Sequence, residues 1–119
     1  MRDFRELKVW QKAHALVLAV YRTTQAFPRI EMYGLTGQVR RACASIPANI
    51  VEGNGRGTDP EMVRFLQIAL GSAGEVDYFL LLAHDLGYMK TADYERLAAE
   101  VAAVMRMLTS FIQKLKANG

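Results

Sequence analysis

Apolar residues recur along this chain at spacings of three and four, the pattern of a helix that buries one face against a partner. The pattern covers residues 7–26, 35–53, 58–86 and 94–115. Proline or glycine interrupts it at residues 27–29, 53–57 and 86–88. None of these stretches alternates apolar and polar residues as a half-buried strand does. The sequence therefore predicts an all-α protein.

The third and fourth stretches keep this spacing for longest and indicate the architecture. Each belongs to a helix of about 27 residues, or roughly 40 Å at 1.5 Å per residue. Helices joined by short turns pack most simply as antiparallel neighbours, and long three-four spacing favours shallow crossing angles. We expect a single domain over residues 1–119, an antiparallel up-down-up-down four-helix bundle.

Proline, glycine and threonine mark the ends and a bend of the expected helices. Pro47 lies inside the second helix, where it lacks an N–H and clashes with the carbonyl of Cys43, so we expect a kink. The segment 58–61, Thr-Asp-Pro-Glu, has the order of an N-cap, an early proline and a capping box. The glycines at 53, 55 and 57 suit the end of the second helix, and Gly87 suits the end of the third.

The first and third helices carry more apolar surface than one seam uses. The expected inward seam of the first helix is Leu7, Trp10, Ala13, His14, Val17, Val20, Tyr21 and Thr24. This choice leaves Val9, Leu16 and Leu18 outside the seam. The third helix has a second apolar row, which is Leu66, Leu70, Ala73 and Leu81.

Exposed together, these side chains would form a patch larger than soluble monomers normally show. Burying one leucine is worth about 1.5–3 kcal/mol, so we expect association between copies. The expected interface residues are Leu66, Leu70, Asp77 and Leu81. Asp77 interrupts the row, and we expect an arginine to pair with it across a helix or subunit boundary, because an unpaired buried charge is costly. The alternative is that the row widens contacts inside one bundle.

Two glycines, Gly71 and Gly74, lie in the middle of the third helix. Each costs about 1 kcal/mol relative to alanine in a helix. A glycine lets another backbone approach closely, either within the bundle or across an interface between copies, and the sequence leaves both readings open.

Charge is distributed unevenly along the chain. The net charge is +3, with 15 basic and 12 acidic residues, but residues 7–51 contain six basic residues and only Glu31 as an acid. The candidate nucleic-acid-binding residues are Lys8, Lys12, Arg22, Arg40, Arg41 and Arg56. Such rows can neutralise phosphates without reading sequence. The alternative is a solvated face with ion pairs to acids such as Glu75 or Asp77.

We find no catalytic residues, metal ligands or cofactor motif in the sequence. His14 and His84 lack the glutamate three residues earlier that a dimetal bundle uses, and neither follows an arginine at the spacing of helical ribonucleases. No phosphate-binding glycine loop is present. Cys43 is the single cysteine, and no apolar run reaches the roughly 20 residues of a membrane span or resembles a secretory signal. We therefore expect a cytoplasmic protein without membrane partners that is not an enzyme.

Residues 33–53, YGLTGQVRRACASIPANIVEG, followed by Gly55-Arg56, resemble the signature of the four helix bundle protein family, also called the 23S rRNA intervening-sequence protein family. Residues 3–13, 65–77 and 86–88 fit the same family. The chain is also similar to the accessory variability protein of diversity-generating retroelements. The resemblance implies an up-down bundle, a barrel-like homopentamer, a basic surface that binds nucleic acid, and a reverse transcriptase as partner.

These observations give two hypotheses for function. The first is a non-enzymatic oligomer that contacts RNA or DNA through its basic face, as an adaptor for a reverse transcriptase or another protein. The second is a purely structural or protein-interaction oligomer whose basic residues serve internal ion pairs.

Overall fold

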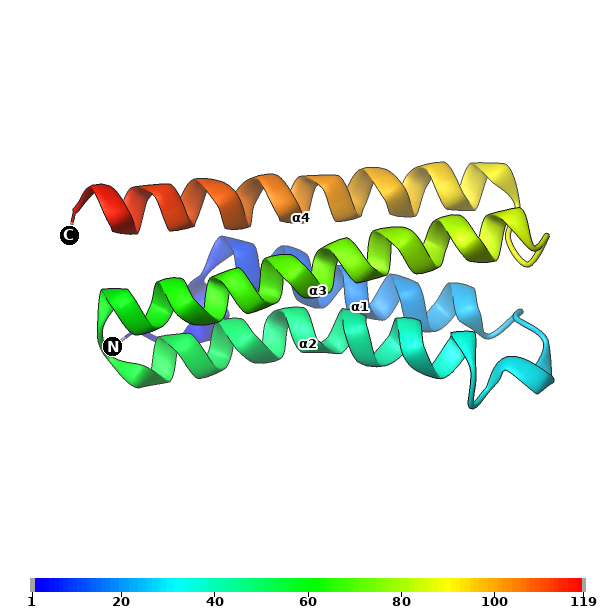
Figure 1. Cartoon of the computed structure of the whole chain (residues 1–119), viewed down its shortest axis with the longest axis horizontal. Coiled ribbons are helices and arrows are strands. Elements are labelled where there is room, and N and C mark those ends of the chain that lie inside the picture. Colours follow the sequence, from blue (N-terminus) through cyan, green and yellow to red (C-terminus); the bar gives the residue numbers. More distant parts are fainter. Residues whose placement is uncertain (1, 119) are drawn as a thin grey trace.

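The computed structural model describes residues 2–118, which form four long helices that run alternately up and down a rod of 46 × 22 × 20 Å (Figure 1). The helices are α1 (Lys8–Thr24), α2 (Leu35–Arg56), α3 (Asp59–Asp85) and α4 (Thr91–Ala117). Two short 3-10 turns, η1 (Phe4–Glu6) and η2 (Arg29–Glu31), precede α1 and α2. The all-α four-helix bundle expected from the sequence is confirmed.

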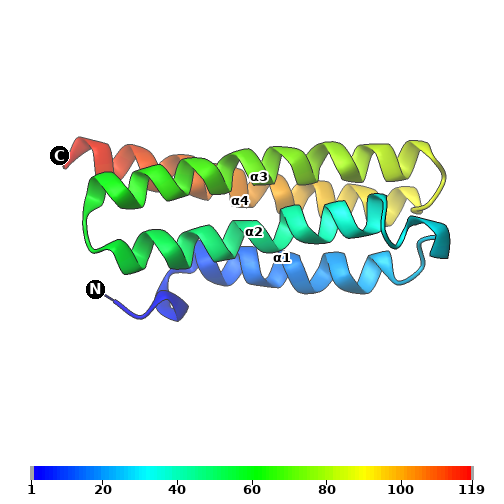
Figure 2. The same ribbon diagram turned by 60° about the horizontal axis from the view of Figure 1, so that its bottom comes forward.

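The helices pack in chain order around one core. α1 contacts α2 and α4, and α3 contacts α2 and α4, so each helix has two antiparallel neighbours (Figure 2). The largest fully buried side chains come from all four helices and include Leu16, Ile46, Ile50, Leu66, Leu80, Leu97 and Leu108. α3 is long and apolar enough to cross a membrane by length and composition, and its core face is buried in the bundle.

The inward face of α1 differs from the seam expected from the sequence. Its buried residues are Val9, Ala13, Leu16, Val20 and Thr24. His14 and Tyr21 are exposed and Trp10 is half-buried, so the buried face is rotated by about a fifth of a turn from the expected seam. Both rows have helical spacing, and the bundle buries the aliphatic one. The indole of Trp10 instead packs between the rings of Phe4 and His14, with centroids 5.0 and 4.9 Å away.

α2 extends one turn further than the glycine pattern predicts. Gly53 is buried inside the helix, where an added Cβ would lie 2.9 Å from the Cβ of Phe65. This glycine therefore lets α2 and α3 approach closely. The helix ends at Gly57, whose φ of 85° is the left-handed conformation of a helix cap. α2 is continuous through Pro47, and the kink expected there stays a prediction.

The ends of α3 follow the sequence signals. The hydroxyl of Thr58 accepts a hydrogen bond from the backbone N–H of Glu61 at 3.4 Å, as an N-cap does. Gly87 has a φ of 81° and follows the last turn. Both C-terminal helices contain 27 residues, as their spacing predicts.

Glu31 joins two connections at the end of the rod opposite the termini. Its carboxylate accepts a hydrogen bond from the backbone N–H of Leu35 at 3.0 Å and another from the hydroxyl of Tyr88 at 2.9 Å. The first bond caps the start of α2, and the second holds the turn between α3 and α4. Both bonds favour the ionised form and hold the pKa of Glu31 below its ordinary value, the contact with Leu35 contributing most.

Candidate functional site

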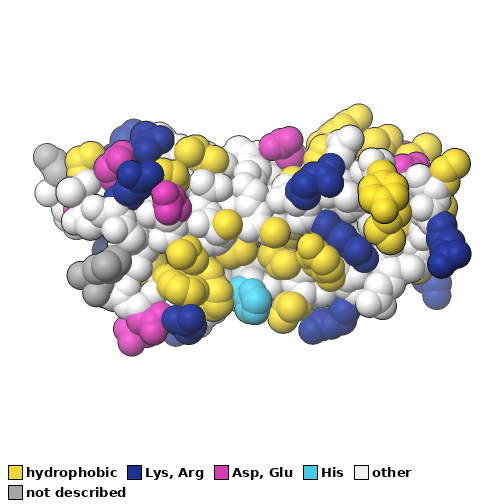
Figure 3. Space-filling view, turned by 90° about the horizontal axis from the view of Figure 1, so that it is seen from below, with side chains coloured by type: hydrophobic (Ala, Val, Ile, Leu, Met, Phe, Trp, Pro, Cys, Tyr) yellow, Lys and Arg dark blue, Asp and Glu magenta, His cyan; other side chains and the backbone are white. Residues whose placement is uncertain are grey.

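Four of the predicted basic residues are exposed and free of ion pairs within the described chain. These are Lys8, Lys12, Arg22 and Arg41. Lys8 and Arg22 are about 21 Å apart along α1 at 1.5 Å per residue. Figure 3 views the side on which α1 and α2 lie, and shows Lys and Arg side chains spaced along the rod with hydrophobic side chains between them. Lys8, Lys12 and Arg22 therefore form an extended row along α1 rather than a single anion pocket. Arg41 lies apart from this row, where it lines a shallow cavity between α2 and α3 together with Glu75.

Arg40 is not free, contrary to the sequence prediction. It is half-buried, and its Nε donates to the hydroxyl of Thr24 at 2.8 Å. Its Nη2 donates to the carbonyl of Tyr21 at 3.3 Å, and its guanidinium carbon lies 4.6 Å from the centroid of the Tyr21 ring. Arg40 thus joins α2 to the last turn of α1, where helix carbonyls lack internal partners. We expected Arg40 on the polar face together with Arg41. Adjacent helix positions differ by about 100°, so Arg40 faces α1 while Arg41 faces outward.

Arg56 is exposed but partly neutralised. Its Nη2 lies 3.0 Å from the carboxylate of Glu52, and its guanidinium lies 5.2 Å from the centroid of the Phe65 ring. Neither Glu75 nor Asp77 forms an ion pair in the described chain, so the alternative in which these acids neutralise Arg40 and Arg41 is not observed.

The predicted interface residues divide into three groups. Leu66 has 0% of its surface exposed and belongs to the core of the single chain, so its assignment to an interface between copies is wrong. Leu70 is half-buried against the core. Leu81 is 42% exposed, and Asp77 is exposed with no arginine partner within the described chain, so a partner from another subunit stays a prediction.

The outer face of α3 contains two open glycines beside exposed apolar side chains. An added Cβ at Gly71 or Gly74 would meet no other atom within 4 Å, so these glycines do not serve close packing inside the chain. Tyr78 is 57% exposed and Leu81 is 42% exposed on the same outward face. We call Gly71, Gly74, Tyr78 and Leu81 the outer α3 face. Tyr78 is not among the interface residues expected from the sequence, although its spacing from Gly71 and Gly74 places it on their side of the helix.

The remaining reactive side chains do not converge in the described chain. Burial raises the pKa of the Cys43 thiol to about 12, which keeps the sulfur protonated and unreactive. His84 lies 3.1 Å from the hydroxyl of Thr91 and stacks on Tyr94, while His14 is exposed on α1. Among residues 2–118, no three His, Cys, Asp or Glu side chains lie close enough to hold a metal ion.

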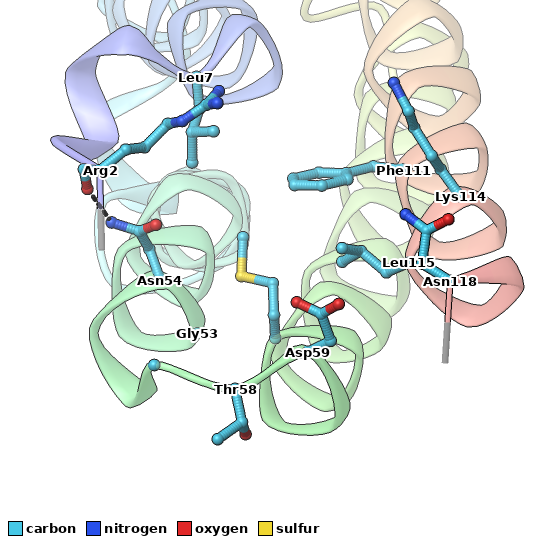
Figure 4. Close-up of a pocket in the computed structure, with 12 residues that line it drawn as sticks. Arg2, Leu7, Gly53, Asn54, Thr58, Asp59, Phe111, Lys114, Leu115 and Asn118 are labelled. Atoms are coloured by element: carbon cyan, nitrogen blue, oxygen red, sulfur yellow. Dashed lines mark hydrogen bonds between the residues drawn. The ribbon is translucent and has the colours of Figure 1, made fainter.

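Two cavities adjoin between the start of α1 and the end of α4. Their volumes are about 450 and 550 Å³, and Leu7, Phe111 and Lys114 line both. Figure 4 shows the first cavity, with Phe111 pointing from α4 toward the opposite wall and Lys114 and Leu115 beside it. The side-chain amide of Asn54 donates to the carbonyl of Arg2 at 2.7 Å and closes one edge. We call this combined opening the end groove.

Comparison with known proteins places the chain in a family. The family model described as 23S rRNA-intervening sequence protein matches residues 5–110. A crystal structure from Bacteroides thetaiotaomicron VPI-5482, described as a protein with unknown function from the S23 ribosomal protein family, is 24% identical with a TM-score of 0.81. That match covers 88% of this chain and 95% of the other, and it shows the shared fold. Comparison with curated proteins gives no match. The match to the family model over residues 5–110 shows that the chain belongs to the 23S rRNA-intervening sequence protein family.

Proposed function

We propose that this protein is a non-enzymatic, self-associating bundle that contacts the phosphate backbone of RNA or DNA through Lys8, Lys12, Arg22 and Arg41. The observation that supports the proposal is that these four cations are exposed and free of ion pairs within the described chain. A free cation that meets a phosphate releases condensed counterions, and this release drives binding. A cation already paired with a carboxylate is partly neutralised and displaces fewer condensed counterions from the phosphates, so it contributes less to the binding free energy.

The arrangement suits a long polyanion better than a small phosphate ligand. The row extends over about 21 Å of α1, which is longer than one nucleotide spans. Its side chains lie on the outside of a bundle whose described residues form helices and their connections, with no strand ribbon to enter a groove. Binding is therefore expected to depend on salt and to ignore sequence.

The test is binding of mixed-sequence single-stranded RNA and DNA at increasing salt. For the triple variant Lys12→Glu/Arg22→Glu/Arg41→Glu we expect at least about a hundredfold loss of affinity and a slope of log K against log salt reduced by about 2. The matched control is Lys90→Glu/Arg96→Glu/Lys116→Glu, which changes the net charge equally on α4 and its preceding turn. We expect the control to keep most of the affinity. Binding that ignores salt, or an equal loss in both triples, contradicts the proposal.

A second candidate function is an oligomer that works through protein contacts alone. The outer α3 face favours self-association. Its glycines lower the stability of the helix, and no close contact inside the chain explains their presence. A backbone from a second copy could approach Gly71 and Gly74 closely while covering Tyr78 and Leu81. The pentamer implied by the family resemblance is the expected state.

Light scattering tests this contact. We expect Tyr78→Lys/Leu81→Lys to lower the subunit number, while the matched variant Ile30→Lys/Met32→Lys, at the exposed apolar residues of the η2 connection, leaves it unchanged. A wild-type protein that is monomeric at high concentration removes self-association from the proposal. An oligomer that binds no nucleic acid at low salt leaves the protein-contact function alone.

A further inference from the structure

The end groove exists because α1 is shorter than α4. α1 has 17 residues and α4 has 27, and Figure 1 shows α4 extending past the first turn of α1 at the end where both termini lie. Leu7 is extended, with a ψ of 122°, and leads away to η1 instead of continuing the helix. The last turns of α4 therefore lack α1 as a neighbour, and the space between them and the end of α2 remains open.

The floor of the end groove is apolar. Its side chains are Leu7, Val9, Met62, Met107, Phe111 and Leu115. The first three are buried, while Met107, Phe111 and Leu115 are half-buried and reachable from the groove. Methionine side chains adapt to irregular partners, which suits a surface that receives apolar side chains from outside.

The rim of the end groove is basic. Arg2, Lys8, Arg106 and Lys114 line the groove together with the apolar side chains, and Asp59 is the one acid among the lining residues. None of the four cations forms an ion pair within the described chain. A groove that combines apolar side chains with four unpaired cations is complementary to a partner with apolar side chains flanked by carboxylates.

We propose that the end groove docks an acidic amphipathic helix of another protein. The lining residues of α4 and its C-cap extend from residue 103 to residue 118, or about 22 Å, which matches about four turns of a helix. Apolar residues at three-four spacing on such a helix would reach Met107, Phe111 and Leu115, and glutamates or aspartates on its flanks would reach the rim. The proposed docking would let the protein act as an adaptor for another protein, and it does not depend on nucleic-acid binding.

Two other occupants fit less well. Nucleic acid would leave the floor unused, because Phe111 is the one aromatic ring there on which a base could stack. A second copy offers the acidic and apolar outer surface of α3 near Asp77 and Leu81. That surface lies toward the opposite end of the rod from the groove, so parallel copies in a closed ring could not bring the two together.

The probe is a fluorescent synthetic peptide of about 16 residues, with leucines at three-four spacing and glutamates between them. We expect wild-type protein to bind it by fluorescence anisotropy. We expect Arg106→Glu/Lys114→Glu to weaken binding at least about tenfold. The matched control Lys90→Glu/Arg96→Glu, at the far end of α4, should bind as wild type. All four substituted residues are exposed, and circular dichroism checks that each variant is folded.

Three results would overturn the docking proposal. They are failure of wild-type protein to bind the acidic peptide, equal binding of the same peptide with lysine in place of glutamate, and a changed subunit number in Arg106→Glu/Lys114→Glu. The last result would assign the groove to a contact between copies. The triple variant Lys12→Glu/Arg22→Glu/Arg41→Glu separates the two proposals, because it should lose nucleic acid and keep the peptide.

Discussion

Thr36 is a buried residue whose hydroxyl has no hydrogen-bond partner in the described chain. It is 2% exposed near the start of α2, and an unsatisfied buried hydroxyl costs about 1–3 kcal/mol. Replacement by valine keeps the shape and removes the polar atom. We expect Thr36→Val to raise the free energy of unfolding by about 1 kcal/mol in urea titrations. The exposed Thr109→Val should change it by less than about 0.5 kcal/mol, and a destabilised Thr36→Val would indicate a bound water at the hydroxyl.

Cys43 offers a second test of one residue. The thiol is 0% exposed, and its pKa of about 12 leaves very little thiolate at neutral pH. Because the thiolate is the reactive form, we expect a thiol-specific reagent to label native protein far more slowly than protein in denaturant. Rapid labelling under native conditions would show that α2 opens locally around Cys43.

At the residue scale, the sequence indicates which side chains can bind phosphate but not which are already occupied. Arg40 and Arg41 are the same residue type at consecutive positions, and the difference between them depends on the position of Tyr21 and Thr24 in another helix. Leu66 and Leu81 likewise belong to one apolar row. The row crosses from the core to solvent along α3, because at about 100° per residue Leu81 lies about 60° around the helix from Leu66.

At the scale of elements, Glu31 links η2, α2 and the α3–α4 turn, and its contribution depends on pH. Its pKa is lowered by the bonds from Leu35 and Tyr88, so the stabilisation is fully present above the ordinary glutamate value of 4.5 and is lost as the pH falls through the lowered pKa. We expect Glu31→Gln to lower the melting temperature at neutral pH. The difference from wild type should shrink in acid.

Thermal melts followed by circular dichroism, from neutral pH to acid, measure how much Glu31 contributes to the melting temperature. Glu95→Gln, an exposed position on α4, serves as the control and should match wild type throughout. A difference between Glu31→Gln and wild type that stays constant into acid would show that the carboxylate charge is not what joins the two connections.

Gly71 and Gly74 give a prediction about α3. Each glycine weakens a helix by about 1 kcal/mol relative to alanine, and an added Cβ meets nothing inside the chain. We expect Gly71→Ala/Gly74→Ala to stabilise dilute, dissociated protein and to weaken self-association at higher concentration. Melts at several protein concentrations separate the two effects. Gly53→Ala is the contrasting variant and should destabilise the chain, because its Cβ would contact Phe65.

Element boundaries and faces were predictable where one local signal decides them. Thr58 and Gly87 mark the ends of α3 because capping depends on neighbouring residues alone. The inward face of α1 was not predictable, since an aliphatic and an aromatic row compete and packing against α2 and α4 chooses between them. Gly53 was misread for a similar reason, because a glycine that ends a helix and one that admits a neighbouring helix look the same in sequence.

At the scale of the whole molecule, the bundle follows from four amphipathic stretches and the connections between them, and the sequence predicts this architecture. The end groove was not predictable, because it results from unequal helix lengths at one end of the rod and not from a motif. Its cations come from both ends of the chain, and Arg2 and Lys114 are 112 positions apart in sequence. No local pattern connects them.

The position of both termini at one end of the rod affects how the protein should be handled (Figure 1). An affinity tag or a fluorescent fusion at either terminus would sit beside the mouth of the end groove and would obstruct anything that docks there. A label is better attached in the connection before α2, at the opposite end, where the Tyr33 side chain is 96% exposed. Pull-down experiments with terminal fusions would therefore miss partners that a label at this connection recovers.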